Sequence, residues 1–219
     1  PIVSPHGHTD PQWYADDAPF PNASALFITP DHYVFRMLYS QGVPLEALGI
    51  PPRADAAAGS RAGGAVETDA RKIWHTFAAH YHLFRGTPTR MWLDHAFRVE
   101  FGMEERLTAE SADRYFDRIN AMLATPAFRP RALFERFNIE VIATTESPLD
   151  TLEHHAAIRA SGWKGRVVTA YRPDPVVDPE FEGFRANLAR FGEITGEDTS
   201  TWSGYLAAHR RRRAFFASM

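Results

Sequence analysis

The stretch IEVIAT, residues 139–144, decides the fold class of this chain. Its β-branched residues are typical of a short strand that is buried on both faces. A second such stretch, RVVTAY, follows at residues 166–171, and the segment from Leu149 to Ser161 between the two has helical character. Another helix is expected around Glu182 to Phe191. The order strand, helix, strand, helix predicts parallel βα units and therefore an α/β fold.

A third strand is expected at Ile2 and Val3, directly before His6-Gly7-His8. Side chains two residues apart on an extended chain point to the same face, so His6 and His8 converge. Neutral imidazole is the commonest protein ligand for zinc and related ions. The pair therefore predicts part of a metal site, whose third ligand must come from elsewhere. The alternative interpretation is two solvated loop histidines.

The long segment between the first two strands is expected to contain helices alone. Asp31 suits the N-cap of a helix over His32 to Gln41, which therefore begins with the polar side chains His32 and Tyr33. Residues 51–65, rich in Pro, Ala and Gly, have no periodicity and are expected to form a loop or a mobile segment. The other predicted helices of this segment cover residues 67–84, 89–101, 109–124 and 131–137.

Composition excludes several classes of protein and site. With 219 residues, 44% hydrophobic and 23% charged, the chain has ordinary globular composition. The net charge of -3 favours neither a nucleic acid nor an anionic membrane as partner. There is no cysteine, so His and carboxylate groups are the only plausible metal ligands. No apolar run is long enough to span a membrane, and a cytoplasmic protein is expected.

Two charged clusters are interpreted as structural. His154 and His155 are adjacent, so their side chains diverge, and both are expected at the surface or on the exterior of a barrel. The four arginines from Arg210 to Arg213 spread around the predicted last helix, residues 203–217, instead of lining one face. They are expected to be a solvated helix end.

The three predicted parallel strands cannot close a barrel and leave an open edge. The chain is therefore expected to be part of a larger sheet.

The sequence resembles the N-terminal half of the uronate isomerase (glucuronate isomerase) family of the amidohydrolase superfamily. The resemblance extends along almost the whole chain and rests on four stretches: HGH at 6–8, DHYVFR at 31–36, HLFRGTPTRMWL at 82–93 and YRPD at 171–174. It implies a (β/α)8 TIM-type barrel, of which this chain holds only the first part, with a large all-helical insertion after strand 1. Residues 1–30 and 130–219 would form the partial barrel, and residues 31–129 the insertion.

The resemblance also implies an activity and its residues. The reaction is the interconversion of D-glucuronate with D-fructuronate and of D-galacturonate with D-tagaturonate, by metal-assisted proton transfer between C2 and C1. His6 and His8 would bind a divalent metal, with zinc the expected ion, and Tyr33 would transfer the proton at C2. His32 would contact the substrate beside Tyr33, and Arg172 would bind the substrate carboxylate in a bidentate manner.

The sequence also departs from the family. Members usually carry two aspartates after the Thr-Thr of the second strand, whereas this chain has Glu146 and Ser147. Members are about twice as long, and the aspartate ligand and arginine expected at the last barrel strand have no counterpart here. The remainder of the barrel, from a missing C-terminal half or a second chain, is thus an expected partner, and homo-oligomerisation stays open. Two alternatives also stay open: a metal-dependent hydrolase of the same superfamily, and a non-catalytic fragment.

Overall fold

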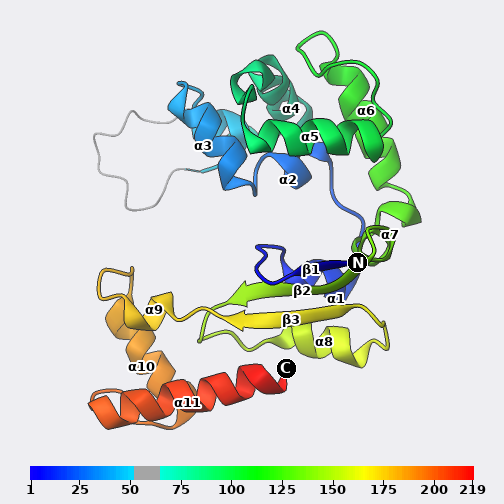
Figure 1. Cartoon of the computed structure of the whole chain (residues 1–219). Helices are drawn as coiled ribbons and strands as arrows, with labels where there is room; N and C mark the ends of the chain where they lie inside the picture. The colour runs from blue at the N-terminus through cyan, green and yellow to red at the C-terminus, as the bar shows by residue number, and fades with distance from the viewer. Residues whose placement is uncertain (52–64) are drawn as a thin grey trace. The chain divides into compact units, whose positions relative to one another are not determined.

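The computed structural model describes residues 1–51 and 65–219 (Figure 1). The predicted loop at 51–65 lies almost entirely outside the described residues. The described chain divides into two compact units. Unit 1 consists of Pro1–Ala18 and Pro130–Met219, and unit 2 consists of Pro19–Arg129.

Unit 1 contains a parallel sheet in the strand order β1-β2-β3 (Figure 1). The strands are β1 (Ile2–Ser4), β2 (Ile139–Glu146) and β3 (Arg166–Tyr171), so all three predicted strands and their parallel order are confirmed. The register pairs Val3 with Val141 and Glu146 with Tyr171. The carboxyl ends of all three strands therefore lie at one edge of the sheet.

Helices α7 (Pro130–Arg136) and α8 (Glu153–Ala160) pack against this sheet, and α1 (Pro11–Asp16) packs against both of them. Burial of their apolar faces against the strands stabilises the unit, because apolar area is removed from water. The side chain and backbone of Arg131 hold α7 against the end of α1 through hydrogen bonds to Tyr14, Ala15 and Asp17. The shared core consists of Tyr14, Phe134, Ile142, Ile158 and Val167.

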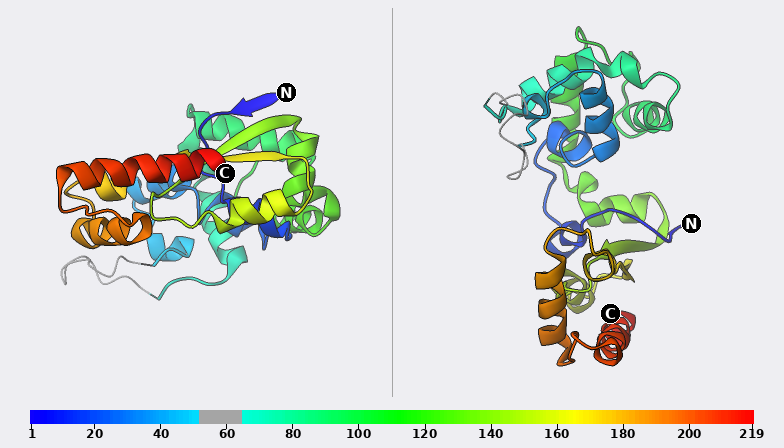
Figure 2. Two further views of the ribbon diagram at one scale, coloured as in Figure 1. Left: turned by 90° about the horizontal axis from the view of Figure 1, so that it is seen from below. Right: turned by 90° about the vertical axis from the view of Figure 1, so that its left-hand side faces the viewer.

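Unit 1 ends with α9 (Asp174–Val177), α10 (Phe184–Thr195) and α11 (Trp202–Ser218). In both views of Figure 2, α10 in orange lies beside α11 in red. The predicted solvation of the arginine run is wrong for Arg212, which is buried. Its guanidinium donates hydrogen bonds to the backbone oxygens of Pro148 and Asp150, so it satisfies carbonyl groups of the loop after β2.

Among the described residues of unit 2, helices are the only regular secondary structure. An aromatic core holds it together, with Trp74, Tyr81 and Phe97 among its fully buried or nearly fully buried side chains. The elements are α2 (Ala23–Phe27), α3 (His32–Ser40), η1 (Leu45–Leu48), α4 (Ala70–Ala79), η2 (Tyr81–Phe84), α5 (Pro88–Val99), α6 (Ala112–Leu123) and η3 (Pro126–Phe128).

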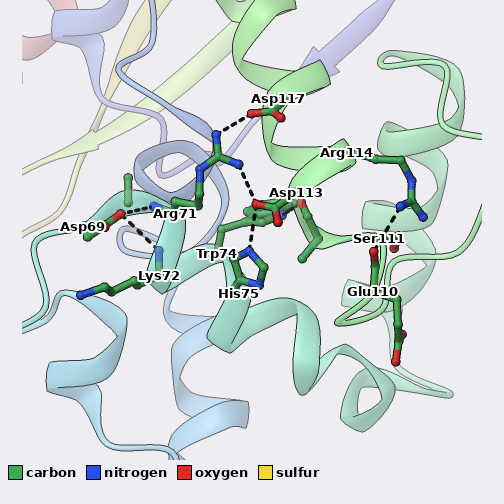
Figure 3. A network of polar contacts seen from close by, with 12 residues as sticks. Asp69, Arg71, Lys72, Trp74, His75, Glu110, Ser111, Asp113, Arg114 and Asp117 are labelled. Atoms are coloured by element: carbon green, nitrogen blue, oxygen red, sulfur yellow. Dashed lines mark hydrogen bonds and ion pairs between the residues drawn. The ribbon is translucent and has the colours of Figure 1, made fainter.

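An exposed ion network joins α4 to α6 (Figure 3). The Arg71 guanidinium contacts Asp113 at 2.7 Å and Asp117 at 2.5 Å, and His75 Nε2 lies 3.0 Å from Asp113 Oδ1. Hydrogen bonds from His75 and Arg71 lower the pKa of Asp113. Because the network is exposed, it fixes the pairing of the two helices more than it stabilises the unit.

The first boundary between the two units lies between Ala18 and Pro19, whereas the resemblance implies a boundary at residue 30. Residues 19–30, which the sequence groups with the strands, belong to the helical unit instead. The reason is α2, because the backbone N–H of Ala23 donates to the Asn120 side chain on α6 and the Ser24 hydroxyl donates to the Ala70 carbonyl on α4.

Among the described residues, no helix is both long enough and apolar enough to cross a membrane.

Candidate active site

The candidate site lies at the carboxyl edge of the sheet in unit 1. A cavity of about 530 Å³ opens there. Segments that follow all three strands line it, with His8 after β1, Glu146 at the end of β2 and Arg172 after β3. Chain segments far apart in sequence therefore bring an imidazole, a carboxylate and a guanidinium to one cavity. The complete lining is His8, Thr9, Asp10, Pro11, Gln12, Thr145, Glu146, Ser147, Asp150, His154 and Arg172.

The predicted convergence of the two N-terminal histidines is confirmed. His6 Nε2 and His8 Nε2 lie 3.0 Å apart, and both residues are exposed. The backbone of Gly7 holds their loop against β2, since its N–H donates to the Ala143 carbonyl at 2.8 Å. A Cβ at Gly7 would stand 3.3 Å from that oxygen, so a glycine permits this close approach.

The spacing of these two nitrogens fits a shared metal ion. Two imidazole nitrogens that each lie about 2.0–2.1 Å from one zinc ion are separated by roughly 3 Å. The described residues contain no group of three or more His, Asp or Glu side chains that could hold an ion. The described residues therefore offer two donors at a suitable distance and lack the third. Without an ion, one neutral imidazole donates a hydrogen bond to the other across the same distance.

Arg172 follows β3 directly, and its half-exposed side chain lines the cavity. Its backbone N–H donates to the Glu146 carbonyl at 3.0 Å, and its Nε donates to Asp174 Oδ2 at 3.2 Å. Among the described residues, the bond to Asp174 is the only hydrogen bond of its side chain. The two terminal nitrogens of the guanidinium are thus available to a ligand. Arg172 and Ser147 also line a second cavity, of about 330 Å³.

His32 and Tyr33 lie in unit 2, at the start of α3. The predicted cap is confirmed, because the Asp31 carboxylate accepts hydrogen bonds from the backbone N–H groups of Tyr33 and Val34. The rings of His32 and Tyr33 are in contact, with centroids 4.2 Å apart, and 64% of Tyr33 is exposed. An aromatic residue so exposed contributes little to the core of unit 2, which leaves its hydroxyl group accessible to a ligand.

The sequence predicts no role for Glu146, and it predicts a position at the surface or on a barrel exterior for His155. The structure buries both, Glu146 at 7% and His155 at 1% exposure. Thr144 and Glu146 are two residues apart in a strand and therefore share a face, which is a signal that the sequence does contain. The contribution of His155 has no such signal, because it depends on how α8 packs on the sheet.

The fold and this edge define an α/β protein with a His-x-His pair and an arginine at the carboxyl ends of neighbouring parallel strands. The model of the glucuronate isomerase family matches residues 1–219. The chain belongs to this family.

Relatives agree with this assignment. The chain is 64% identical over 219 residues to a uronate isomerase of Phenylobacterium zucineum and 66% identical over 218 residues to one of Xanthomonas axonopodis pv. citri. Each comparison covers 100% of this chain and 44% of the relative.

Solved structures give the same result. The crystal structure of glucuronate isomerase from Caulobacter crescentus is 56% identical, with a TM-score of 0.91. The crystal structure of uronate isomerase from Thermotoga maritima is 26% identical, with a TM-score of 0.85. Both comparisons cover 100% of this chain and 44% of the solved chain. The chain thus spans less than half the length of the relatives that it matches.

Proposed function

We propose that the protein encoded by this gene interconverts aldose and ketose hexuronates, D-glucuronate with D-fructuronate and D-galacturonate with D-tagaturonate. The observation that carries the proposal is the cavity at the carboxyl edge, which His8 and Arg172 line together in a chain of the glucuronate isomerase family. Its volume of about 530 Å³ suits a small sugar acid. A guanidinium supplies the counter-charge that a uronate needs and a neutral hexose does not.

We further propose that β1, β2 and β3 are the first strands of a (β/α)8 barrel, with unit 2 as the helical insertion after β1. Their parallel order and the location of the cavity at their carboxyl ends support this, because barrel enzymes carry their active sites there. The remainder of the barrel is then the partner that pairs with the strand edges. That remainder would also supply the third metal ligand.

His6 and His8 are the proposed ligands of a divalent metal ion, with zinc the expected ion. Their nitrogen separation of 3.0 Å supports this assignment. A bound divalent ion would supply Lewis-acid polarisation of the substrate oxygens. His8 also lines the cavity that Arg172 lines, which supports a metal donor and a carboxylate site in the same cavity.

Arg172 is the proposed carboxylate-binding residue. The Nε of the Arg172 guanidinium donates to Asp174, so its two terminal nitrogens can donate to the two oxygens of the C6 carboxylate. A bidentate contact of this kind fixes one end of the substrate. The reacting carbons C1 and C2 lie at the other end of the sugar chain, where orientation determines the rate.

The isomerisation moves one proton from C2 to C1 and one from the O2 hydroxyl to O1, so that the aldehyde becomes an alcohol and C2 becomes a ketone. The family pattern assigns the transfer at C2 to Tyr33 and a substrate contact to His32. The exposure of Tyr33 is consistent with a hydroxyl group that acts on a ligand.

The test is ketose formation by the protein expressed from its complete gene, with D-glucuronate and D-galacturonate as substrates and D-glucose as control. D-Glucose has the same reacting carbons and lacks the carboxylate. We expect turnover of the uronates and little or no turnover of D-glucose. Absence of ketose from both uronates would overturn the proposal.

A further inference from the structure

A buried polar cluster backs the candidate site. Glu146 is the last residue of β2, and its carboxylate accepts a short hydrogen bond from the Thr169 hydroxyl on β3. Its other oxygen, Oε1, lies 3.9 Å from His155 Nε2 on α8. The side chains of Glu146 and His155 are 6% and 1% exposed. Three elements of unit 1 thus meet at one carboxylate.

The hydrogen bonds of this cluster define the state of His155. The Thr144 hydroxyl lies 2.9 Å from His155 Nε2 and 3.3 Å from the Val168 carbonyl. Since the carbonyl can only accept, the hydroxyl donates to it, and Nε2–H donates to the hydroxyl. His155 Nδ1 has no hydrogen-bond partner among the described residues. Burial lowers the pKa of His155, so a neutral imidazole stands behind the Glu146 carboxylate.

Burial of a carboxylate opposes folding unless hydrogen bonds satisfy it. Packing alone does not require a carboxylate at position 146, because replacing buried charged groups by packed apolar groups is often neutral or stabilising. Stability alone therefore does not explain Glu146. A function at the site does, because Glu146 also lines the cavity with His8 and Arg172.

The backbone connects Glu146 to Arg172 directly. The Glu146 carbonyl accepts the Arg172 N–H at 3.0 Å, immediately after the last register pair of β2 and β3, Glu146 with Tyr171. The side chain of Glu146 binds β3 a second time, through Thr169. Both the backbone and the side chain of Glu146 therefore hold the end of β2 to the end of β3.

We propose that Glu146 is a positioning residue for Arg172: its buried carboxylate, held by Thr169 and backed by His155, locks the ends of β2 and β3 so that the guanidinium enters the cavity at a fixed point. The role in substrate binding rests on the proposed function of Arg172. The role in fixing the strand ends rests on the hydrogen bonds alone.

The kinetic test uses the protein expressed from its complete gene. We expect Glu146→Ala to raise the KM for D-glucuronate about tenfold with kcat changed less than about twofold, since binding is lost and chemistry is kept. Glu146→Gln retains an oxygen that accepts from Thr169, so we expect it to restore most of the affinity. Glu140→Ala, at an exposed position of the same strand, is the matched control with unchanged kinetics.

A double-mutant cycle tests whether Glu146 acts through Arg172. If Glu146 acts through Arg172, Glu146→Ala will raise KM by less than about twofold in an Arg172→Met background, because coupled residues are not additive. Additive effects, or an unchanged KM in Glu146→Ala, would overturn the proposal. An unchanged KM in Arg172→Met would instead count against the proposed carboxylate site.

A second measurement does not depend on activity. Amide hydrogen exchange at Arg172 reports the bond to the Glu146 carbonyl, and exchange at Val168 reports the middle of β3. We expect Glu146→Ala to accelerate exchange at Arg172 about tenfold or more while Val168 stays protected. Equal protection of Arg172 in variant and wild type would overturn the proposal. If Glu146→Ala does not fold, Thr169→Val removes the same side-chain bond and takes its place.

Discussion

His6 Nε2 and His8 Nε2 lie 3.0 Å apart, both directed to one point by a loop whose glycine contacts β2. Such a pair makes a specific prediction about metal content. The proposed metal site predicts that the double variant His6→Ala with His8→Ala retains less divalent metal than the wild type, because both proposed ligands of this chain are removed. Elemental analysis measures this. His82→Ala, an exposed histidine of unit 2, is the control, and equal metal content in all three proteins would contradict the assignment.

Arg172→Met should raise the KM for D-glucuronate by about 10- to 100-fold, since the proposed charge-assisted bidentate contact is lost. Asp174→Asn should raise this KM less, because an amide oxygen still accepts the hydrogen bond from Arg172 Nε and only the negative charge at position 174 is lost. Arg190→Met is the control, since Arg190 is an exposed arginine on α10 that pairs with Glu193. Steady-state kinetics give both constants. An unchanged KM in Arg172→Met would move the carboxylate site elsewhere.

Tyr33→Phe should lower kcat by about 100-fold and leave the melting temperature nearly unchanged, because the hydroxyl group is the proposed proton-transfer group and contributes little to packing. Tyr39→Phe is a matched control, since Tyr39 lies on the same helix and is 61% exposed against 64% for Tyr33. Kinetics and thermal unfolding on the same samples separate the two effects. A parallel loss of activity and stability would assign Tyr33 a structural role.

The stability of the protein should depend on the titration of His155. Burial lowers the pKa of His155, Glu146 and Asp150 oppose this shift, and His154 adds to it. The pKa of His155 is therefore lower in the folded state than its ordinary value of about 6.5 in the unfolded state. Below about pH 6.5 the unfolded state binds more protons than the folded state. The stabilisation is therefore fully present above about pH 6.5 and is lost as the pH falls toward the folded value.

Urea unfolding at about pH 7.5 and about pH 5.5 measures this dependence. We expect the wild type to lose more free energy of unfolding between these values than His155→Gln, whose side chain does not titrate. His154→Gln should keep most of the wild-type dependence, because His154 makes the smallest contribution to the pKa shift of His155. Identical pH dependence in the wild type and His155→Gln would contradict the prediction.

Local patterns predicted the parts of this structure that depend on neighbouring residues in the chain. The strands at 139–144 and 166–171, the cap at Asp31 and the convergence of His6 and His8 follow from β-branched runs, side-chain chemistry and strand alternation. The five-residue helix α2 was not predicted, because it is too short for periodicity to show.

Parts that depend on tertiary packing were predicted poorly. Arg212 was expected in solvent, but carbonyls of the loop after β2 cover it. His155 was expected at the surface or on a barrel exterior, and its burial beside Thr144 was not predicted. The cluster around Glu146 requires the register that sets Thr144 beside Thr169, which no single strand encodes. Burial of a polar group depends on the element that packs against it, and a helical pattern alone does not identify that element.

Proton NMR of D-glucuronate in D2O with the protein expressed from its complete gene tests the central claim most directly. Proton transfer between C2 and C1 predicts loss of the C2 proton signal of the aldose, the appearance of D-fructuronate, and deuterium at C1 of the product. Ketose that retains full protium at C1 would show instead that the hydrogen reaches C1 without exchange with the solvent, as in a hydride shift or a shielded proton transfer. No loss of the C2 signal and no ketose would contradict the isomerase itself.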